Sequence, residues 1–272
     1  MTDELLYVYT VLRSAPPPSP PLALDARARL GRGLGLVEYR GLAAVVEPVE
    51  AVDFDEEPLR AHLEDLDWLA DVARAHHDVV AHVGHRTTTV PLRLATLCRG
   101  RSGVRRMLAD AYEVLGEALE RVTDAEEWGV KLYAQPAAQP ASPDTPPAES
   151  GPGAAPAPSG RDYLRRRLAH RRAEADRTGE ARRAAEALHQ RLTGEASGAV
   201  LHPPQQQQLS QAPGQNVLNA AYLVPTAHRQ AFLDRVPAAD DLPPGVRVEV
   251  TGPWVPYSFT HTTAPAPSAE ST

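Results

Sequence analysis

The sequence contains almost no lysine and almost no cysteine: Lys131 and Cys98 are the only ones among 272 residues. A single cysteine excludes an intramolecular disulfide, which fits a protein made in a reducing compartment. Arginine therefore supplies nearly all of the positive charge. Because alanine and proline are also abundant, a GC-rich genome accounts for this bias, and it indicates no functional demand for guanidinium groups.

Long hydrophobic runs are also missing. No stretch approaches the ~20 apolar residues that span a bilayer, and the apolar run at residues 5–12 is too short for a signal peptide and lacks its basic leader. The net charge of -7 argues against a general nucleic-acid or anionic-membrane binder, which needs a positive field. We expect a soluble cytoplasmic protein that binds neither nucleic acid nor a membrane.

Residues that carry catalysis do not form a recognisable set. No serine lies in a Gly-x-Ser-x-Gly turn, and nothing in the sequence shows a histidine converging on Cys98. Glu126 and Glu127 are adjacent, so a strand places them on opposite faces. The histidines at positions 76, 77, 82 and 85 lack the partners of a zinc site, which favours a solvated helix end. We expect no catalytic site, no metal and no cofactor.

Residues 1–135 predict a ferredoxin-like α+β domain. Branched and aromatic side chains predict strands at residues 5–12, 36–39 and 42–46, and the first is apolar on both faces, as a central strand would be. One helix is expected over residues 53–80, because its first turn holds acidic residues and a proline and an apolar stripe follows.

The stretch 90–133 predicts a strand, a helix and a strand. Between residues 103 and 123, apolar side chains recur every three or four positions, which predicts one helix covering a sheet. Arg93 and Glu127 would form an ion pair across the first sheet if their strands are neighbours. In the closing strand, side chains alternate between two faces: Trp128, Val130 and Leu132 on one, Glu127, Lys131 and Tyr133 on the other.

Composition changes abruptly after Tyr133. Residues 136–160 are mostly Pro, Ala, Ser and Gly without a large apolar side chain, and predict a disordered linker. Residues 260–272 predict a disordered tail. Residues 161–259 predict a second α+β domain, whose expected elements are a long helix with a thin apolar stripe, strands at 198–202, 217–224 and 246–250, and a short helix at 226–236.

An aromatic segment closes the second predicted domain. Trp254 lies between two prolines, and Tyr257 and Phe259 follow it. Prolines interrupt strand pairing, so we expect this segment to leave the sheet as an extended strap. Its rings either pack between the two domains, which we favour, or form a surface for a partner.

Three ordered motifs together span most of the chain. They are Val90–Thr96 (VPLRLAT) with Glu127–Tyr133 (EWGVKLY), Asn219–Val224 (NAAYLV), and Thr251–Phe259 (TGPWVPYSF). These motifs resemble those of the gas vesicle protein GvpL/GvpF family. The first departs from the Arg-Phe-Gly-Thr expected of that family, because residues 93–96 are Arg-Leu-Ala-Thr.

The resemblance implies a non-enzymatic accessory protein of gas vesicle formation. It implies binding to the small hydrophobic shell protein and to other accessory proteins, synthesis in the cytoplasm, and association with the vesicle, with its gas-facing surface as one location. The candidate partner-binding or structural positions are Arg93, Thr96, Glu127, Trp128, Lys131, Tyr133, Tyr222, Trp254, Tyr257 and Phe259.

Two other functions stay open from the residues alone. A ferredoxin-like domain pair also fits a small-molecule sensor or enzyme, which a ligand-dependent rise in melting temperature would reveal. The basic stretch at residues 161–172 also fits a nucleic-acid contact, which steep salt dependence would reveal. Acidic residues further along that stretch favour a solvated helix face.

Overall fold

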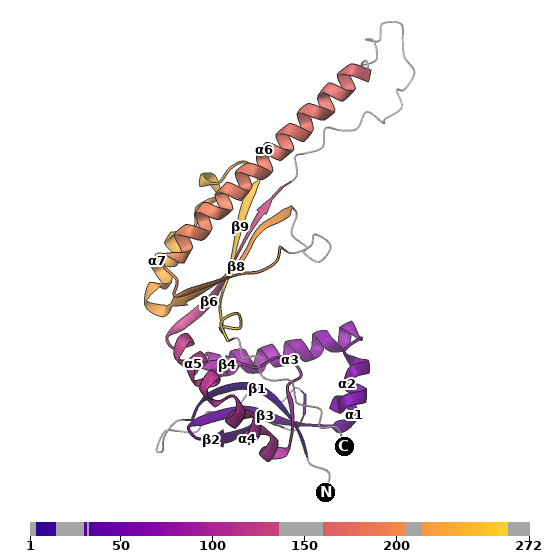
Figure 1. Ribbon diagram of the computed structural model, residues 1–272, viewed down its shortest axis with the longest axis vertical. Helices are drawn as coiled ribbons and strands as arrows, with labels where there is room; N and C mark the ends of the chain where they lie inside the picture. Colours follow the sequence, from indigo (N-terminus) through magenta and orange to yellow (C-terminus); the bar gives the residue numbers. More distant parts are fainter. Residues whose placement is uncertain (1–3, 15–29, 32, 136–159, 205–213, 261–272) are drawn as a thin grey trace. The chain divides into compact units, whose positions relative to one another are not determined.

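The computed structural model describes residues 4–14, 30–31, 33–135, 160–204 and 214–260, and Figure 1 shows a mixed α+β protein. The predicted α+β class is confirmed. The chain forms two compact units, Met1–Glu127 with Gly252–Thr272, and Trp128–Thr251. In sequence, the second unit is thus inserted into the first. Residues 136–159 and 261–272, where the linker and tail are predicted, lie outside the described residues.

The first unit is built on an antiparallel sheet with β1 (Leu5–Arg13) at its centre. Side chains of β1 from Leu5 to Leu12 are all buried, so both faces of the strand are covered, as its apolar sequence predicts. The strand order is β2 (Gly35–Tyr39), β3 (Leu42–Val49), β1 and β4 (Thr89–Pro91), and β5 (Leu97–Arg99) pairs with the start of β1.

Helices cover both faces of this sheet. On one face, Tyr7 and Tyr9 of β1 share a core with α3 (Leu66–Gly84). On the other face lies α4 (Gly100–Asp110), where a Cβ added at Gly103 would come 3.5 Å from the Cβ of Cys98. Cys98 pairs in register with Leu6, which alternates with Tyr7. The two helical segments therefore sandwich one sheet, as their apolar stripes predict.

The prediction of one continuous helix over residues 53–80 is wrong. The chain forms α1 (Ala51–Phe54), α2 (Glu56–His62) and then α3. The Asp65 carboxylate accepts hydrogen bonds from the backbone N–H groups of Asp67 and Trp68, at 3.0 and 3.2 Å. Asp65 is therefore the N-cap of α3, which begins as a separate helix.

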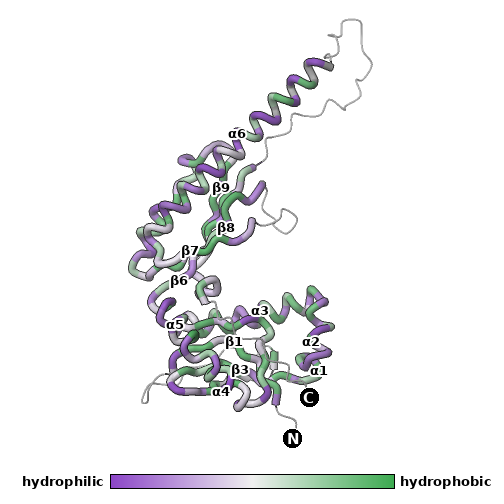
Figure 2. The backbone as a smooth tube through the Cα atoms, viewed as in Figure 1, coloured by the Kyte–Doolittle hydropathy of each residue, from purple (hydrophilic) through white to green (hydrophobic). Residues whose placement is uncertain are grey.

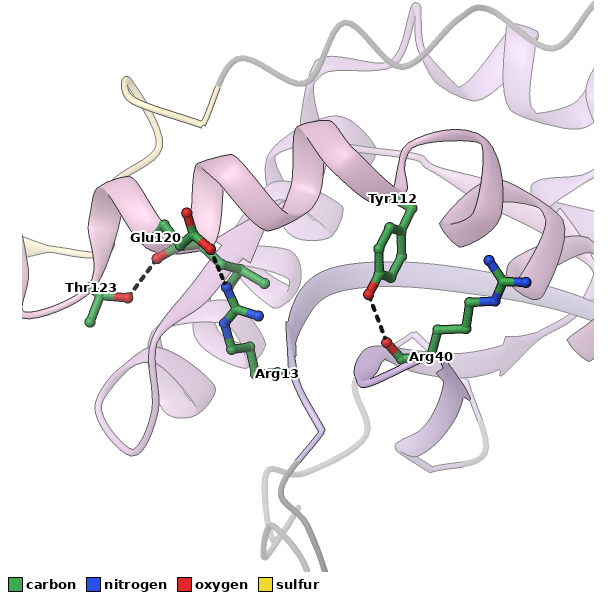
Figure 3. Close-up of polar contacts among 6 residues, drawn as sticks. Arg13, Arg40, Tyr112, Glu120 and Thr123 are labelled. Atoms are coloured by element: carbon green, nitrogen blue, oxygen red, sulfur yellow. Dashed lines mark hydrogen bonds and ion pairs between the residues drawn. The ribbon is translucent and has the colours of Figure 1, made fainter.

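The helix expected over residues 103–123 is also divided, at Ala111, into α4 and α5 (Tyr112–Val122). Polar contacts fix α5 against the strands below it (Figure 3). The Tyr112 hydroxyl donates to the Arg40 carbonyl at 3.1 Å, and Arg13 pairs with Glu120 at 3.0 Å. Both helices contact β1, but α4 also contacts β2 and β5, whereas α5 contacts β4.

The second unit has a four-stranded sheet whose core is a single apolar cluster. The long helix α6 (Gly160–Thr193), predicted over residues 161–195, contributes Ala185, Leu188 and Leu192 to this core. The short helix α7 (Arg229–Asp234) contributes Phe232. The strand order is β7 (Gly198–Leu201), β8 (Gln215–Pro225), β6 (Ala125–Ala134) and β9 (Val246–Trp254), with 3-10 turns at Thr226–His228 and Ala239–Asp241.

Strand β6 corrects one expectation from the sequence. We expected it to close the first sheet, but it lies between β8 and β9 in the second. Alternation of side chains fixes which residues share a face and leaves the partner strand undefined. The units differ from the predicted limits of 1–135 and 161–259, because β6 enters the second unit at Trp128 and Gly252 returns the chain to the first. That residues 1–135 and 161–259 each fold as a separate domain stays a prediction.

Candidate partner-binding surface

The chain returns to the first unit through residues 252–260, which we call the C-terminal strap. Val255 packs on the core formed by β1, β3 and α3. It fits against Gly84 at the end of α3, where an added Cβ would lie only 2.3 Å from the Val255 Cγ2 atom. Gly84 therefore forms a notch that a larger residue would fill, and this notch holds the strap.

Hydrogen bonds fasten the strap beyond this notch. Ser258 donates twice to the Glu127 carboxylate, from its backbone N–H at 2.8 Å and from its hydroxyl at 2.7 Å. The Arg121 guanidinium donates to the Phe259 carbonyl at 3.0 Å, and the Phe259 ring is buried. Because Glu127 is itself almost fully buried, its pair of bonds is well shielded from water.

Two aromatic rings of the strap remain partly exposed. Trp254 is 45% exposed and Tyr257 is 36% exposed. Both rings contact His77 of α3, with centroid distances of 5.9 Å for Trp254 and 6.3 Å for Tyr257. Burial of its hydroxyl raises the pKa of Tyr257. The rings are thus held in place from one side while each presents apolar surface on the other.

A buried polar chain lies in the core of the same unit. The Ala95 backbone N–H donates to the Tyr7 hydroxyl at 3.0 Å, and this hydroxyl lies 3.0 Å from the His76 Nδ1 atom. Since the hydroxyl accepts from Ala95, it can donate to His76 when the ring is neutral. Burial lowers the pKa of His76 to about 4. Nearby, the Tyr9 hydroxyl donates to Glu47 at 2.5 Å.

The first motif forms the turn between β4 and β5. Thr96 closes this turn, because its hydroxyl donates to the Arg93 carbonyl at 2.7 Å. The Arg93 side chain is exposed. Arg93 lies in this turn and Glu127 lies in β6 of the other sheet, so the condition for the predicted cross-strand ion pair is not met. Ala95 in this turn has a left-handed backbone, with φ of 58°.

The candidate residues of the second unit serve its core. Trp128 lies in the apolar cluster with Phe232, at a ring distance of 6.3 Å. Tyr222 is buried, and its hydroxyl lies 2.8 Å from the His189 Nδ1 atom. Tyr133 is buried beneath Arg247, whose guanidinium carbon lies 4.8 Å from the ring centroid.

Those three aromatic residues are buried, and Lys131 of β6 is partly buried. The predicted alternation in β6 is confirmed, because Trp128, Val130 and Leu132 all enter the core cluster. Exposed candidates are therefore confined to the first unit. They are Arg93, Trp254 and Tyr257.

The sequence did not indicate the residues that hold the strap. Gly84 and His77 lie on a helix more than 170 positions away from Val255 and Trp254, and no local pattern links them. Ser258 also lacked a signal, since its partner Glu127 was expected to face Arg93. The strap was expected to pack between two domains, whereas the contacts described above are all with residues of the first unit.

Within the described ranges, no group of three or more His, Cys, Asp or Glu side chains is arranged to hold a metal ion. None of the helices in the described part of the chain is long and apolar enough to cross a bilayer. Burial raises the pKa of the Cys98 thiol, which is the opposite of what activates a nucleophile.

Comparisons with known proteins agree with the motifs. A family model described as "Gas vesicle synthesis protein GvpL/GvpF" matches residues 5–261. The chain is 49% identical over 261 residues to gas vesicle protein L of Streptomyces sp. (strain CB03234), covering 95% of this chain and 93% of that protein.

Two crystal structures of gas vesicle protein GvpF share its fold at 14% sequence identity. The structure from Anabaena sp. PCC7120 has a TM-score of 0.61 and the alignment covers 96% of this chain and 97% of that one. The structure from Microcystis aeruginosa has a TM-score of 0.58, with 95% and 99% covered. At this identity the structural likeness supports the fold alone.

Proposed function

This chain belongs to the gas vesicle synthesis protein GvpL/GvpF family, and on that premise we propose that it is a non-enzymatic accessory protein that binds the small hydrophobic shell protein. It assists nucleation or assembly of the vesicle. It acts in the cytoplasm and at the vesicle, its gas-facing surface included, together with other accessory proteins. Binding, and not chemistry, is the basis of this function.

The surface that supports this proposal is the pair of partly exposed rings of Trp254 and Tyr257. Exposed aromatic side chains fixed in one position are effective anchors for an apolar partner, because little side-chain entropy is lost on binding. The strap fixes both rings through Val255 in the Gly84 notch and through the bonds between Ser258 and Glu127. An apolar shell subunit would bury these rings and shield its own surface from aggregation.

The alternative of strand addition at a sheet edge is less well supported. β2 is the strand at one edge of the first sheet, and β4 and β5 lie at the other edge. Arg101 and Arg105 of α4 donate to its Leu36 and Glu38 carbonyls, at 2.8 and 3.4 Å. An incoming strand would have to displace these bonds. The rings of Trp254 and Tyr257 therefore offer a lower-cost binding site for the shell protein than the β2 edge.

The test is a pull-down of purified shell protein by the full chain and by the double variant Trp254→Ala/Tyr257→Ala. We expect retention to fall by roughly tenfold or more, since two anchors of this kind each contribute about 1–2 kcal/mol. Tyr112→Ala is the matched control, because Tyr112 is a similarly exposed aromatic residue on α5. Equal retention by wild type and the double variant, with both folded, would contradict this site.

A further inference from the structure

Among the described residues, the apolar stripe of α6 is buried only in the C-terminal half of the helix. The apolar stripe of this helix is buried at Ala181, Ala185, Leu188 and Leu192. The same stripe continues toward the N-terminus at Leu164 and Leu168, which are 59% and 55% exposed. Figure 1 shows α6 extending past the strands it covers, and Figure 2 shows its outer turns alternating between hydrophilic and hydrophobic residues.

This exposed half is strongly basic in an acidic chain. Residues 160–172 contain six arginines and one aspartate, a net charge of +5, whereas the whole chain carries -7. Arg171 and Arg172 lie three and four positions beyond Leu168, so they flank the leucines on one side of the helix. A surface that combines two exposed leucines with flanking arginines suits a partner that is apolar and acidic.

A surface of that kind is present on the first unit. Residues 50–71 contain nine acidic residues and one arginine, a net charge of -8. Among them the side chains of Val52, Leu63 and Leu66 are exposed, with Leu66 at 78%. We call α1, α2 and the first turn of α3, with these side chains, the acidic face.

Internal contacts hold the acidic face together as one surface. The His62 Nδ1 atom lies 3.2 Å from the Asp53 carbonyl, and the His62 ring stacks on Trp68 at 4.7 Å. The Phe54 ring also contacts Trp68, at 5.5 Å. These contacts fix α1 and α2 against the start of α3, so the exposed apolar and acidic side chains keep a defined arrangement.

We propose that the basic half of α6 docks on the acidic face of a second copy of this chain. Opposite charges attract the two surfaces, and burial of Leu164 and Leu168 against the exposed apolar residues of the acidic face adds stability. Residues 136–159, which precede α6 in the sequence, contain no large apolar side chain. This inference is independent of shell-protein binding.

Such a contact joins two different surfaces, so it is heterologous. Each copy keeps one basic helix and one acidic face free for the next copy, and repetition of the contact gives a ring or an open chain of subunits. The mass of the assembly should therefore rise with protein concentration. It should fall when salt increases from about 0.1 M to about 1 M, because the Debye length shortens from about 10 Å to about 3 Å.

The experiment measures the mass of the full chain by sedimentation velocity over a range of concentrations. The first variant, Arg171→Glu/Arg172→Glu, should weaken self-association about tenfold or more, because like charges then face each other. The second variant, Glu57→Arg/Glu64→Arg, should do the same. An equal mixture of the two variants should restore association, since each supplies the surface that complements the other.

Arg182→Glu/Arg183→Glu is the matched control, because it makes the same charge change on an exposed part of the same helix beyond the basic half. It should leave the mass unchanged. A chain that is monomeric at every concentration would overturn the proposal. So would association that survives both reversals, or reversal of Arg171 and Arg172 that reduces shell-protein retention without changing the mass.

Discussion

Gly84 determines whether the strap can dock, because its missing side chain is the space that Val255 occupies. Gly84→Ala puts a methyl group only 2.3 Å from the Val255 Cγ2 atom, so the strap must shift or Val255 must change rotamer. We expect a loss of about 1–3 kcal/mol in the free energy of unfolding, as for other overpacked sites. Denaturant titration of the full chain measures this loss.

A double-mutant cycle separates this clash from a general effect on α3. Val255→Ala removes the clashing methyl group, so its effect and that of Gly84→Ala should fail to add by at least about 0.5 kcal/mol. Additive effects would mean that the residues do not meet, and the strap would then be fixed by Ser258 and Phe259 alone.

Among the connecting elements, the turn between β4 and β5 carries local strain. Ala95 has φ of 58°, a conformation that costs a residue with a side chain about 1–2 kcal/mol relative to glycine. Ala95→Gly should therefore stabilise the chain, by about 0.5–1 kcal/mol after the entropy cost of glycine. Ala61→Gly, in the exposed part of α2, should instead destabilise it by a similar amount. Thermal unfolding of the two variants compares these opposite signs.

The elements themselves were largely predictable from periodicity. Strands β1, β2, β3 and β8 and helix α6 follow alternating or three-to-four-residue patterns that the sequence carries locally. Breaks at Asp65 and Ala111 were missed, because the apolar stripes continue through both positions. Which sheet β6 joins was also missed, since its apolar face suits either sheet.

The candidate surface was predictable only in part, because local patterns do not show which distant segments meet. Trp254 and Tyr257 stand out in the sequence because they lie beside Pro253 and Pro256, and proline is rare in strand interiors. Their support by Gly84, His77 and Glu127 depends on chain segments more than 120 positions away, and a single sequence contains no record of such contacts. The motifs contain buried candidates such as Tyr222 and Trp128 as well as exposed ones. Membership of a motif therefore does not tell a residue of the core from a residue available to a partner.

At the scale of the whole molecule, His76 makes stability depend on pH. Its pKa falls from 6.5 in the unfolded chain to about 4 in the folded one, mainly because the ring is buried. Between these values the unfolded state binds the extra proton, so stability is complete above pH 6.5 and is lost as pH falls toward 4. The loss should approach about 3 kcal/mol.

Denaturant titrations from pH 7 to pH 4 measure this dependence. His76→Asn keeps an acceptor near the Tyr7 hydroxyl without a titrating ring, so its stability should vary less over this range. His85→Asn, at an exposed histidine, should keep the wild-type profile. If His76→Asn follows the wild type instead, the acid sensitivity arises from other groups.

The insertion of one unit into the sequence of the other sets an order of events during synthesis. The first unit needs Val255, Ser258 and Phe259 to fill its notch and satisfy Glu127, yet residues 128–251 are translated before them. At about 5–20 residues per second, those 124 residues take about 6–25 s to make. Throughout that interval the nascent chain presents an open Gly84 notch, and the Trp254 and Tyr257 surface is assembled only after residues 252–260 have been made. The strap can therefore dock only after the whole inserted unit has been synthesised.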